Sequence, residues 1–183
     1  MSRERDTGNL RLVRTGRGRK HRGFMTPLST HTRRQLSYAE GYLALGMAAE
    51  AAEALAEIGG AEADATPVLG LRLAAAVERA KWKQAALLGA MLSDREPHVA
   101  GHWIQWAYAI RRHTGIGDAR KILLRGVALH PRVAVFYFNL ACYAAQLGDL
   151  ADARAFLDTA CGLDAGFEEL AKTDDDLAPL RSA

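Results

Sequence analysis

Residues 137–165, YFNLACYAAQLGDLADARAFLDTACGLDA, hold two amphipathic segments on either side of Gly148 and Asp149. Apolar side chains recur in both segments at the three- and four-residue spacing of one helix face. Glycine readily adopts the left-handed conformation that ends a helix, and an aspartate after it can cap the next helix. The stretch therefore predicts two helices joined by a tight turn.

The same pattern recurs through the chain at a fixed interval of 34 residues, without an insertion between residues 32 and 167. The positions that keep this interval are Ala51, Ala85, Ala119 and Ala153; Leu55, Gly89, Leu123 and Leu157; Ala39, Leu73, Ala107 and Ala141; Leu69, Trp103 and Tyr137; and Pro97 and Pro131. A period of this length is typical of helical repeat arrays. Small residues such as Ala107 and Ala119 let the two helices of a hairpin approach closely.

The period divides the chain into a basic, flexible tail over residues 1–29 and a helical domain over residues 30–183. The domain consists of four repeats and a C-terminal cap, with bounds of about 32–65, 66–99, 100–133, 134–167 and 168–183. The cap is expected to cover the apolar end of the fourth repeat with Leu177 and Leu180. We interpret Asp174, Asp175 and Asp176 as a solvated turn within it.

The repeats differ in how well they fit the pattern. The second is degenerate, because Leu73 stands where a small residue is expected and Gly89 where a large one is expected. We expect this repeat to be the most loosely or irregularly packed. Pro67, Pro97 and Pro131 are each expected at the first position of a helix, where a proline loses no hydrogen bond.

The residues of this pattern resemble those of the tetratricopeptide repeat family. The fourth repeat carries the likeness best, with hallmark residues at Tyr137, Leu140, Ala141, Gly148, Ala153, Leu157 and Ala160. The third matches through Trp103, Ala107, Ala119, Leu123 and Pro131, with Gly126 as its later small residue. The resemblance covers residues 32–167 and implies an all-α fold, an α-α superhelix formed as a right-handed solenoid of about four hairpins with a C-terminal capping helix.

The resemblance also implies a concave groove lined by the first helix of each hairpin. The side chains that we place in it as a partner-binding surface are Arg33, Ser37, Glu40, Gln105, Tyr108, Arg111, Arg112, Phe138, Asn139 and Gln146. Ala74, Glu78, Ile104 and Cys142 occupy the remaining groove positions. Arg111 and Arg112 beside Tyr108 suit a carboxylate through charge-assisted hydrogen bonds and stacking. A solvated helix end is the alternative interpretation of the two arginines.

Motifs for common catalytic chemistry are absent, including a phosphate-binding glycine loop with a lysine, a GxSxG elbow and an HExxH helix. His98 and His102 have a spacing that could place them on one helix face, but no Cys or carboxylate ligand accompanies them. Cys142 and Cys161 are interpreted as packed, reduced thiols. We therefore predict no enzyme activity, no catalytic residue, no metal site and no cofactor.

Charge is distributed unevenly along the chain. The net charge is +3, yet residues 1–24 alone contain eight basic and two acidic residues, while the remainder is slightly acidic. A flexible cationic segment such as RTGRGRKHRG could bind phosphates, so nucleic-acid or other polyanion binding through the tail is the alternative function. A start at Met25, which would make residues 1–24 a misassigned extension, is a third interpretation and, with plain disorder, the one that we favour for the tail.

The sequence thus favours a non-catalytic protein–protein interaction module or scaffold. The expected partner is a protein or peptide, for which an acidic segment is one option, and nucleic acid ranks below it. No apolar run is long enough to span a membrane, and no secretory signal is recognisable, so a cytoplasmic protein is expected. We expect a monomer or a weak homodimer.

Overall fold

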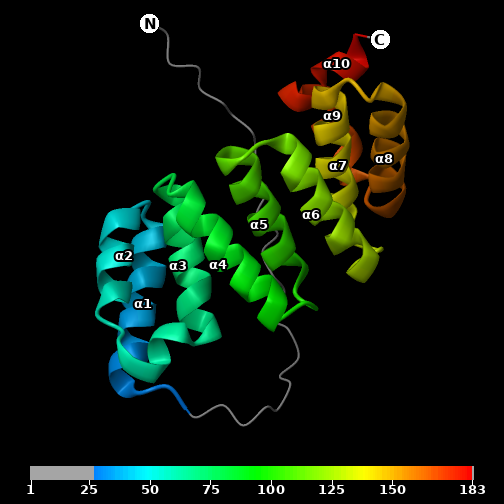
Figure 1. Cartoon of the computed structure of the whole chain (residues 1–183). Coiled ribbons are helices and arrows are strands. Elements are labelled where there is room, and N and C mark those ends of the chain that lie inside the picture. The colour runs from blue at the N-terminus through cyan, green and yellow to red at the C-terminus, as the bar shows by residue number, and fades with distance from the viewer. Residues whose placement is uncertain (1–26, 183) are drawn as a thin grey trace, which may run out of the picture.

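The computed structural model describes residues 27–182, and every regular element within that range is helical. Eight α-helices form four successive antiparallel hairpins (Figure 1). Their bounds are α1 Thr30–Ala44, α2 Ala48–Ala56, α3 Thr66–Glu78, α4 Trp82–Arg95, α5 Ala100–His113, α6 Ile116–Leu129, α7 Ala134–Leu147 and α8 Leu150–Leu163. The remaining elements are the 3-10 helices η1 Gly60–Asp64 and η2 Asp175–Leu177 and the helices α9 Gly166–Thr173 and α10 Ala178–Arg181. None of the described helices is long and apolar enough to cross a membrane.

The predicted all-α superhelix is confirmed, and its core follows the 34-residue pattern. The helices α3, α5 and α7 begin at Thr66, Ala100 and Ala134, which are 34 residues apart. The alanines at the helix crossings are fully buried, with no exposed surface at Ala51, Ala85, Ala107, Ala119, Ala141 and Ala153. Any larger side chain at these crossings would push the two backbones of a hairpin apart.

Two of the three prolines lie outside the helices, which corrects the expected placement. Pro67 is in the first turn of α3, but Pro97 and Pro131 lie in the turns that precede α5 and α7. Their carbonyl oxygens accept hydrogen bonds from the aromatic residue six positions later, from Trp103 Nε1 and Tyr137 Oη, both at 3.1 Å. Before α5 and before α7, the proline and the aromatic residue therefore act together to fix the entry into the helix.

The first hairpin is irregular because α2 is short. It has nine residues, whereas α4, α6 and α8 each have 14. The chain leaves the helix before Gly59 and Gly60 and forms η1, which is tied back to the start of α1. Glu62 accepts hydrogen bonds from Ser29 N at 2.7 Å, from Ser29 Oγ at 2.8 Å and from the hydroxyl of the buried Thr32. These hydrogen bonds, above all that from Thr32, hold the pKa of Glu62 below its ordinary value.

The second hairpin approaches the third closely at Gly89, so this glycine is a packing residue and not a defect. A Cβ atom at Gly89 would lie 2.8 Å from both Cα and Cβ of Trp106, so only glycine permits this approach of α4 to α5. Leu73 is also enclosed, with 1% of its surface exposed. The looser packing expected of this repeat is found between its own helices α3 and α4 and where α3 meets the short α2.

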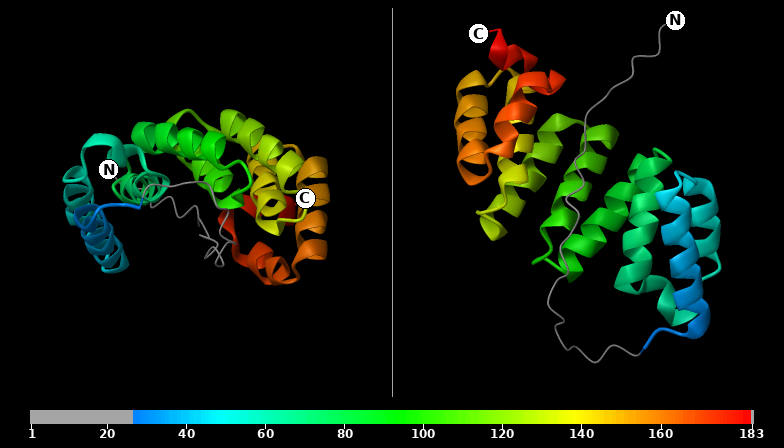
Figure 2. Two further views of the ribbon diagram at one scale, coloured as in Figure 1. Left: turned by 90° about the horizontal axis from the view of Figure 1, so that it is seen from below. Right: turned by 180° about the vertical axis from the view of Figure 1, so that it is seen from behind.

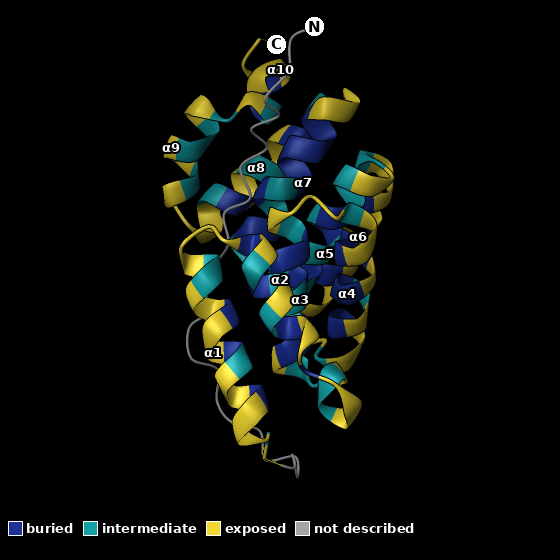
Figure 3. Cartoon of the chain, turned by 90° about the vertical axis from the view of Figure 1, so that its left-hand side faces the viewer, coloured by how far each residue is buried: buried dark blue, intermediate teal, exposed yellow. Residues whose placement is uncertain are grey.

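The hairpins follow an arc, and the C-terminal segment turns back toward the inside of this arc (Figure 2, left). There it contacts α7 through η2 and α10. The helix α7 is consequently enclosed on several sides (Figure 3), and nine of its 14 residues are buried. The C-terminal segment, residues 166–182, thus covers the inner side of the fourth hairpin as well as its end.

Candidate functional site: a groove occupied by the C-terminal segment

The centre of the candidate site is an ion pair between α5 and η2. Arg111 Nη1 lies 2.5 Å from Asp176 Oδ2, and Arg111 Nη2 lies 2.8 Å from Asp176 Oδ1. The side chains are only 15% and 17% exposed. The guanidinium carbon also lies 5.2 Å from the ring centroid of Tyr143 on α7. Arg111 thus holds one carboxylate in a bidentate pair. The pair is largely shielded from water and lies against an aromatic ring.

Main-chain and apolar contacts hold the C-terminal segment around this ion pair. Gln146 Nε2 donates a hydrogen bond to the main-chain oxygen of Asp176 at 2.9 Å. Asp174 Oδ1 accepts from the main-chain N–H of Asp176 at 2.9 Å and so caps η2. The following Leu177 is 1% exposed and Leu180 is 8% exposed. The segment therefore combines one gripped carboxylate with two buried leucines.

Phe138 and Asn139 also face the C-terminal segment. The ring of Phe138 lies 4.9 Å from that of Phe167, measured between centroids. A small cavity of about 50 Å³ beside them is lined by Val135, Phe138, Asn139, Phe167, Leu170, Thr173 and Asp174. Phe138 and Asn139 thus lie in a part of the groove that the C-terminal segment occupies.

Burial sets the protonation of the groups beneath the segment. Cys142 and Tyr143 are buried, and this desolvation raises the pKa of the thiol and of the phenol well above their ordinary values. Partial burial likewise raises the pKa of Asp174. Burial of Cys142 therefore disfavours its thiolate, which is the reactive form of the side chain.

Cys142, Asp174 and Asp176 form the one cluster of metal-ligating types found among residues 27–182. One ligand atom from each lies within 4.8 Å of the others. Both carboxylate oxygens of Asp176 accept hydrogen bonds from Arg111, so the guanidinium is the cation that balances this cluster. The expected solvated turn is therefore wrong for Asp176, which is paired and mostly buried.

The other predicted groove residues lie elsewhere, near the start of α4, on α1 and on α5. Tyr108 and Arg112 face the start of α4, where Tyr108 meets Trp82 edge to face at 5.7 Å and Arg112 lies 5.1 Å from the Trp82 ring centroid. Arg33, Ser37 and Glu40 are exposed on α1, and Gln105 is half-buried on α5. The structure thus brings Arg111, Phe138, Asn139 and Gln146 together beneath the C-terminal segment and leaves the remaining groove residues apart from them.

Three participants were missed from the sequence, namely Tyr143, Trp82 and Asp176. None belongs to a repeated column, and no local signal pairs Asp176 with an arginine 65 residues away. The histidine pair is also corrected. His98 lies in a turn and His102 in α5, where His102 Nε2 lies 3.1 Å from a carboxylate oxygen of Glu96, so the two do not share a helix.

Comparison with known proteins places the fold. No family model matches the sequence, and no curated protein matches it. Solved structures do match. One is MamA of Desulfovibrio magneticus RS-1, from residue 41 to its end, which superposes with a TM-score of 0.67 at 15% sequence identity. The superposition covers 85% of this chain and 92% of that one. The fold is a tetratricopeptide-type α-α superhelix. MamA from MSR-1 also superposes, with a TM-score of 0.57 at 17% identity, over 84% of this chain and 97% of that one. At these identities the likeness concerns the fold, and the functional argument rests on this chain's own side chains.

Proposed function

We propose that the protein is a non-catalytic scaffold that binds an acidic segment of a partner protein in the groove now occupied by residues 166–182. The observation that carries this proposal is the two-pronged grip of Arg111 on Asp176 over the ring of Tyr143. A groove that recognises a carboxylate in its own chain has the chemistry to recognise one in another chain.

The C-terminal segment also indicates which residues a partner needs in order to bind in its place. The gripped aspartate is followed directly by the buried Leu177, and Leu180 is buried three positions later. We infer that the partner presents an aspartate followed by apolar residues at this spacing. Its binding displaces the C-terminal segment, because both need the same guanidinium.

A labelled peptide with the sequence of residues 171–182, AKTDDDLAPLRS, tests this proposal. In the parent chain the attached segment competes at an effective concentration in the millimolar range, so the free peptide binds weakly. An Asp176→Asn chain removes much of this competition and is expected to bind the peptide at least about tenfold more tightly, measured by fluorescence anisotropy. Adding Arg111→Gln to that chain is expected to abolish the gain, whereas adding Arg112→Gln serves as the matched control and retains it.

The reactivity of Cys142 gives an independent measurement. Its sulfur lies within 4.8 Å of carboxylate oxygens of Asp174 and Asp176, so removal of the segment uncovers it. Alkylation of Cys142 is expected to be faster in the Asp176→Asn chain and slowed again by the bound peptide. A second peptide carries asparagine in place of the third aspartate. If it bound as tightly as AKTDDDLAPLRS, the proposed recognition of this aspartate would be wrong.

A further inference from the structure

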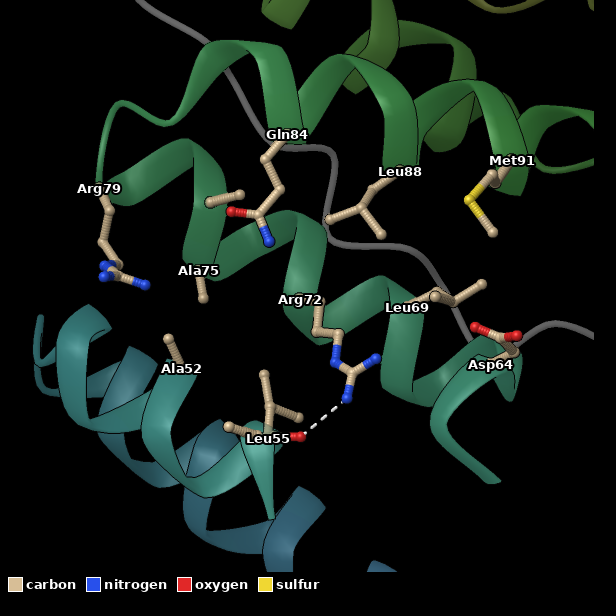
Figure 4. Close-up of a pocket in the computed structure, with 12 residues that line it drawn as sticks. Ala52, Leu55, Asp64, Leu69, Arg72, Ala75, Arg79, Gln84, Leu88 and Met91 are labelled. Carbon is tan, nitrogen blue, oxygen red and sulfur yellow. Dashed lines mark hydrogen bonds between the residues drawn. The ribbon is translucent and has the colours of Figure 1, made fainter. Parts of the chain in front are cut away.

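A second cleft lies on the opposite side of the hairpins from the C-terminal segment, between the second helices α2 and α4. It has a volume of about 370 Å³, with α3 as its floor (Figure 4). The helix α2, on one side of the cleft, is five residues shorter than α4 on the other. The chain continues from α2 through Gly59 and Gly60 into η1, whose Asp64 also lines the cleft.

Two guanidinium groups and one amide point into the cleft. Figure 4 shows Arg72 near its middle and Arg79 and Gln84 toward one end, all directed into the space between α2 and α4. Arg72 is anchored from below, because it donates to the main-chain oxygens of Ala63 at 2.9 Å, Leu55 at 3.0 Å and Ile58 at 3.2 Å. Three acceptors do not use all five of its N–H groups. Its charge is held rigidly without a carboxylate partner among the described residues.

The rest of the lining is apolar, with one exception. Leu55, Leu69, Ala75 and Ala76 are buried beneath the opening, and Leu88 and the more exposed Met91 form the wall on α4. Asp64 stands at the end away from Arg79 (Figure 4). The charges are therefore separated along the cleft, with positive charge in the middle and at one end.

We propose that this cleft binds a small carboxylate with an unbranched aliphatic chain. The carboxylate would bind Arg79, with Gln84 as a further donor and the charge of Arg72 attracting it at longer range, and the chain would lie along Leu88 toward Leu69 and Met91. A volume of this size is at the lower end of small-molecule pockets and is too small for a protein element such as a packed helix. Two guanidinium groups favour an anion, and the apolar wall favours a hydrocarbon chain over a bare inorganic ion.

Octanoate is a suitable probe for the full chain, observed through the methyl NMR signals of Leu88 and Met91. Saturable shifts with a dissociation constant below about 1 mM are expected. Octylamine, which has the same chain and the opposite charge, is expected to produce none. A hexapeptide with a free C-terminal leucine carboxylate separates the two sources of this chemistry, and its binding in place of octanoate would overturn the small-molecule assignment.

Exposed positions provide variants that leave the fold intact. Arg79→Gln is expected to weaken octanoate binding about tenfold, because it removes one charge-assisted contact. Ala56→Phe, which fills the cleft from α2, is expected to abolish binding. Lys83→Gln is the matched control, since Lys83 is an exposed cation on α4 that does not line the cleft, and its affinity should equal that of the parent. Equal affinity of the Arg79→Gln and parent chains, or no shifts at all in the parent, would disprove the site.

Discussion

Ala80 has a backbone φ of 53°, in the left-handed region that residues other than glycine avoid. The equivalent positions of the first and fourth repeats are Gly46 and Gly148, with φ values of 73° and 83°. The turn of the second hairpin therefore uses the same geometry with a less suitable residue. The strain at an alanine is roughly 1–2 kcal/mol.

Replacing this alanine tests the strain directly. Ala80→Gly relieves the strain but adds roughly 0.4–1 kcal/mol of chain entropy to the unfolded state. The free energy of unfolding is therefore expected to rise by about 0.5–1 kcal/mol, measured by urea denaturation. Ala90→Gly, within α4, is the control and should lower it by about as much. A lower stability of the Ala80→Gly chain would show that no strain is stored at this turn.

The glycines show where sequence reasoning succeeded and where it failed. Gly126 was predicted as a small packing residue, and a Cβ there would lie 2.4 Å from Phe136 Cε1. Gly89 was interpreted as a defect of the same pattern, yet it admits the backbone of Trp106. The atoms that a Cβ at Gly89 would meet are Cα and Cβ of residue 106, so the close approach of α4 to α5 requires the glycine, and a repeat column does not record how closely two helices approach.

At the scale of elements, the C-terminal segment is held by two aspartates with opposite energetic effects. Asp176 is paired with Arg111, and its loss removes two hydrogen bonds from a guanidinium in a largely buried place. Partial burial raises the pKa of Asp174 above its ordinary value, so folding disfavours its charged form. Its contribution to stability therefore becomes less favourable as the pH rises through the range between its unfolded and folded pKa values.

Asparagine at these two positions should accordingly act in opposite directions at neutral pH. Asp176→Asn is expected to lower the free energy of unfolding by about 2 kcal/mol. Asp174→Asn keeps an oxygen that can accept from the main-chain N–H of residue 176 and loses the unfavourable charge. It is expected to raise stability slightly, by about a few tenths of a kcal/mol, because solvent screens a half-buried group. Denaturation at pH 7 and at pH 3.5 checks both effects, and the gain from Asp174→Asn should shrink at the lower pH.

The position of this segment illustrates the limit of sequence reasoning about the site. The apolar pair of Leu177 and Leu180 was enough to predict a cap, and both leucines are buried. The groove residues were placed from the resemblance to the tetratricopeptide family, which implies which face of each first helix lines the groove. What occupies that face depends on contacts such as that between Arg111 and Asp176, and contacts between residues so far apart leave no periodic trace in the sequence.

At the scale of the whole molecule, the two sides of the superhelix differ in how they are completed. The C-terminal half of the inner side is covered by the chain's own residues 166–182, whereas α1 leaves Arg33, Ser37 and Glu40 exposed. The outer side has its opening beside the short α2. A partner in the groove and a small carboxylate in the cleft therefore contact separate surfaces, and each can be tested without disturbing the other.

The basic tail is the remaining question at this scale, since residues 1–26 lie outside the described residues. Among the described residues, contacts from residue 28 onward hold the first hairpin. Leu28 packs on the core of this hairpin, and Ser29 and Thr32 are bonded to Glu62. A chain without residues 1–24 is therefore expected to keep the helical circular dichroism signal and the melting temperature of the full chain.

The same deletion separates the proposed groove function from polyanion binding. In the Asp176→Asn background, affinity for the labelled acidic peptide is expected to be unchanged by the deletion, because Arg111 and Tyr143 lie within the helical domain. Binding of the full chain to a single-stranded oligonucleotide through eight cationic side chains would fall steeply between 50 and 200 mM salt and vanish with the tail. A chain that lost peptide binding together with residues 1–24 would contradict the groove assignment, because every residue of that assignment lies after residue 24.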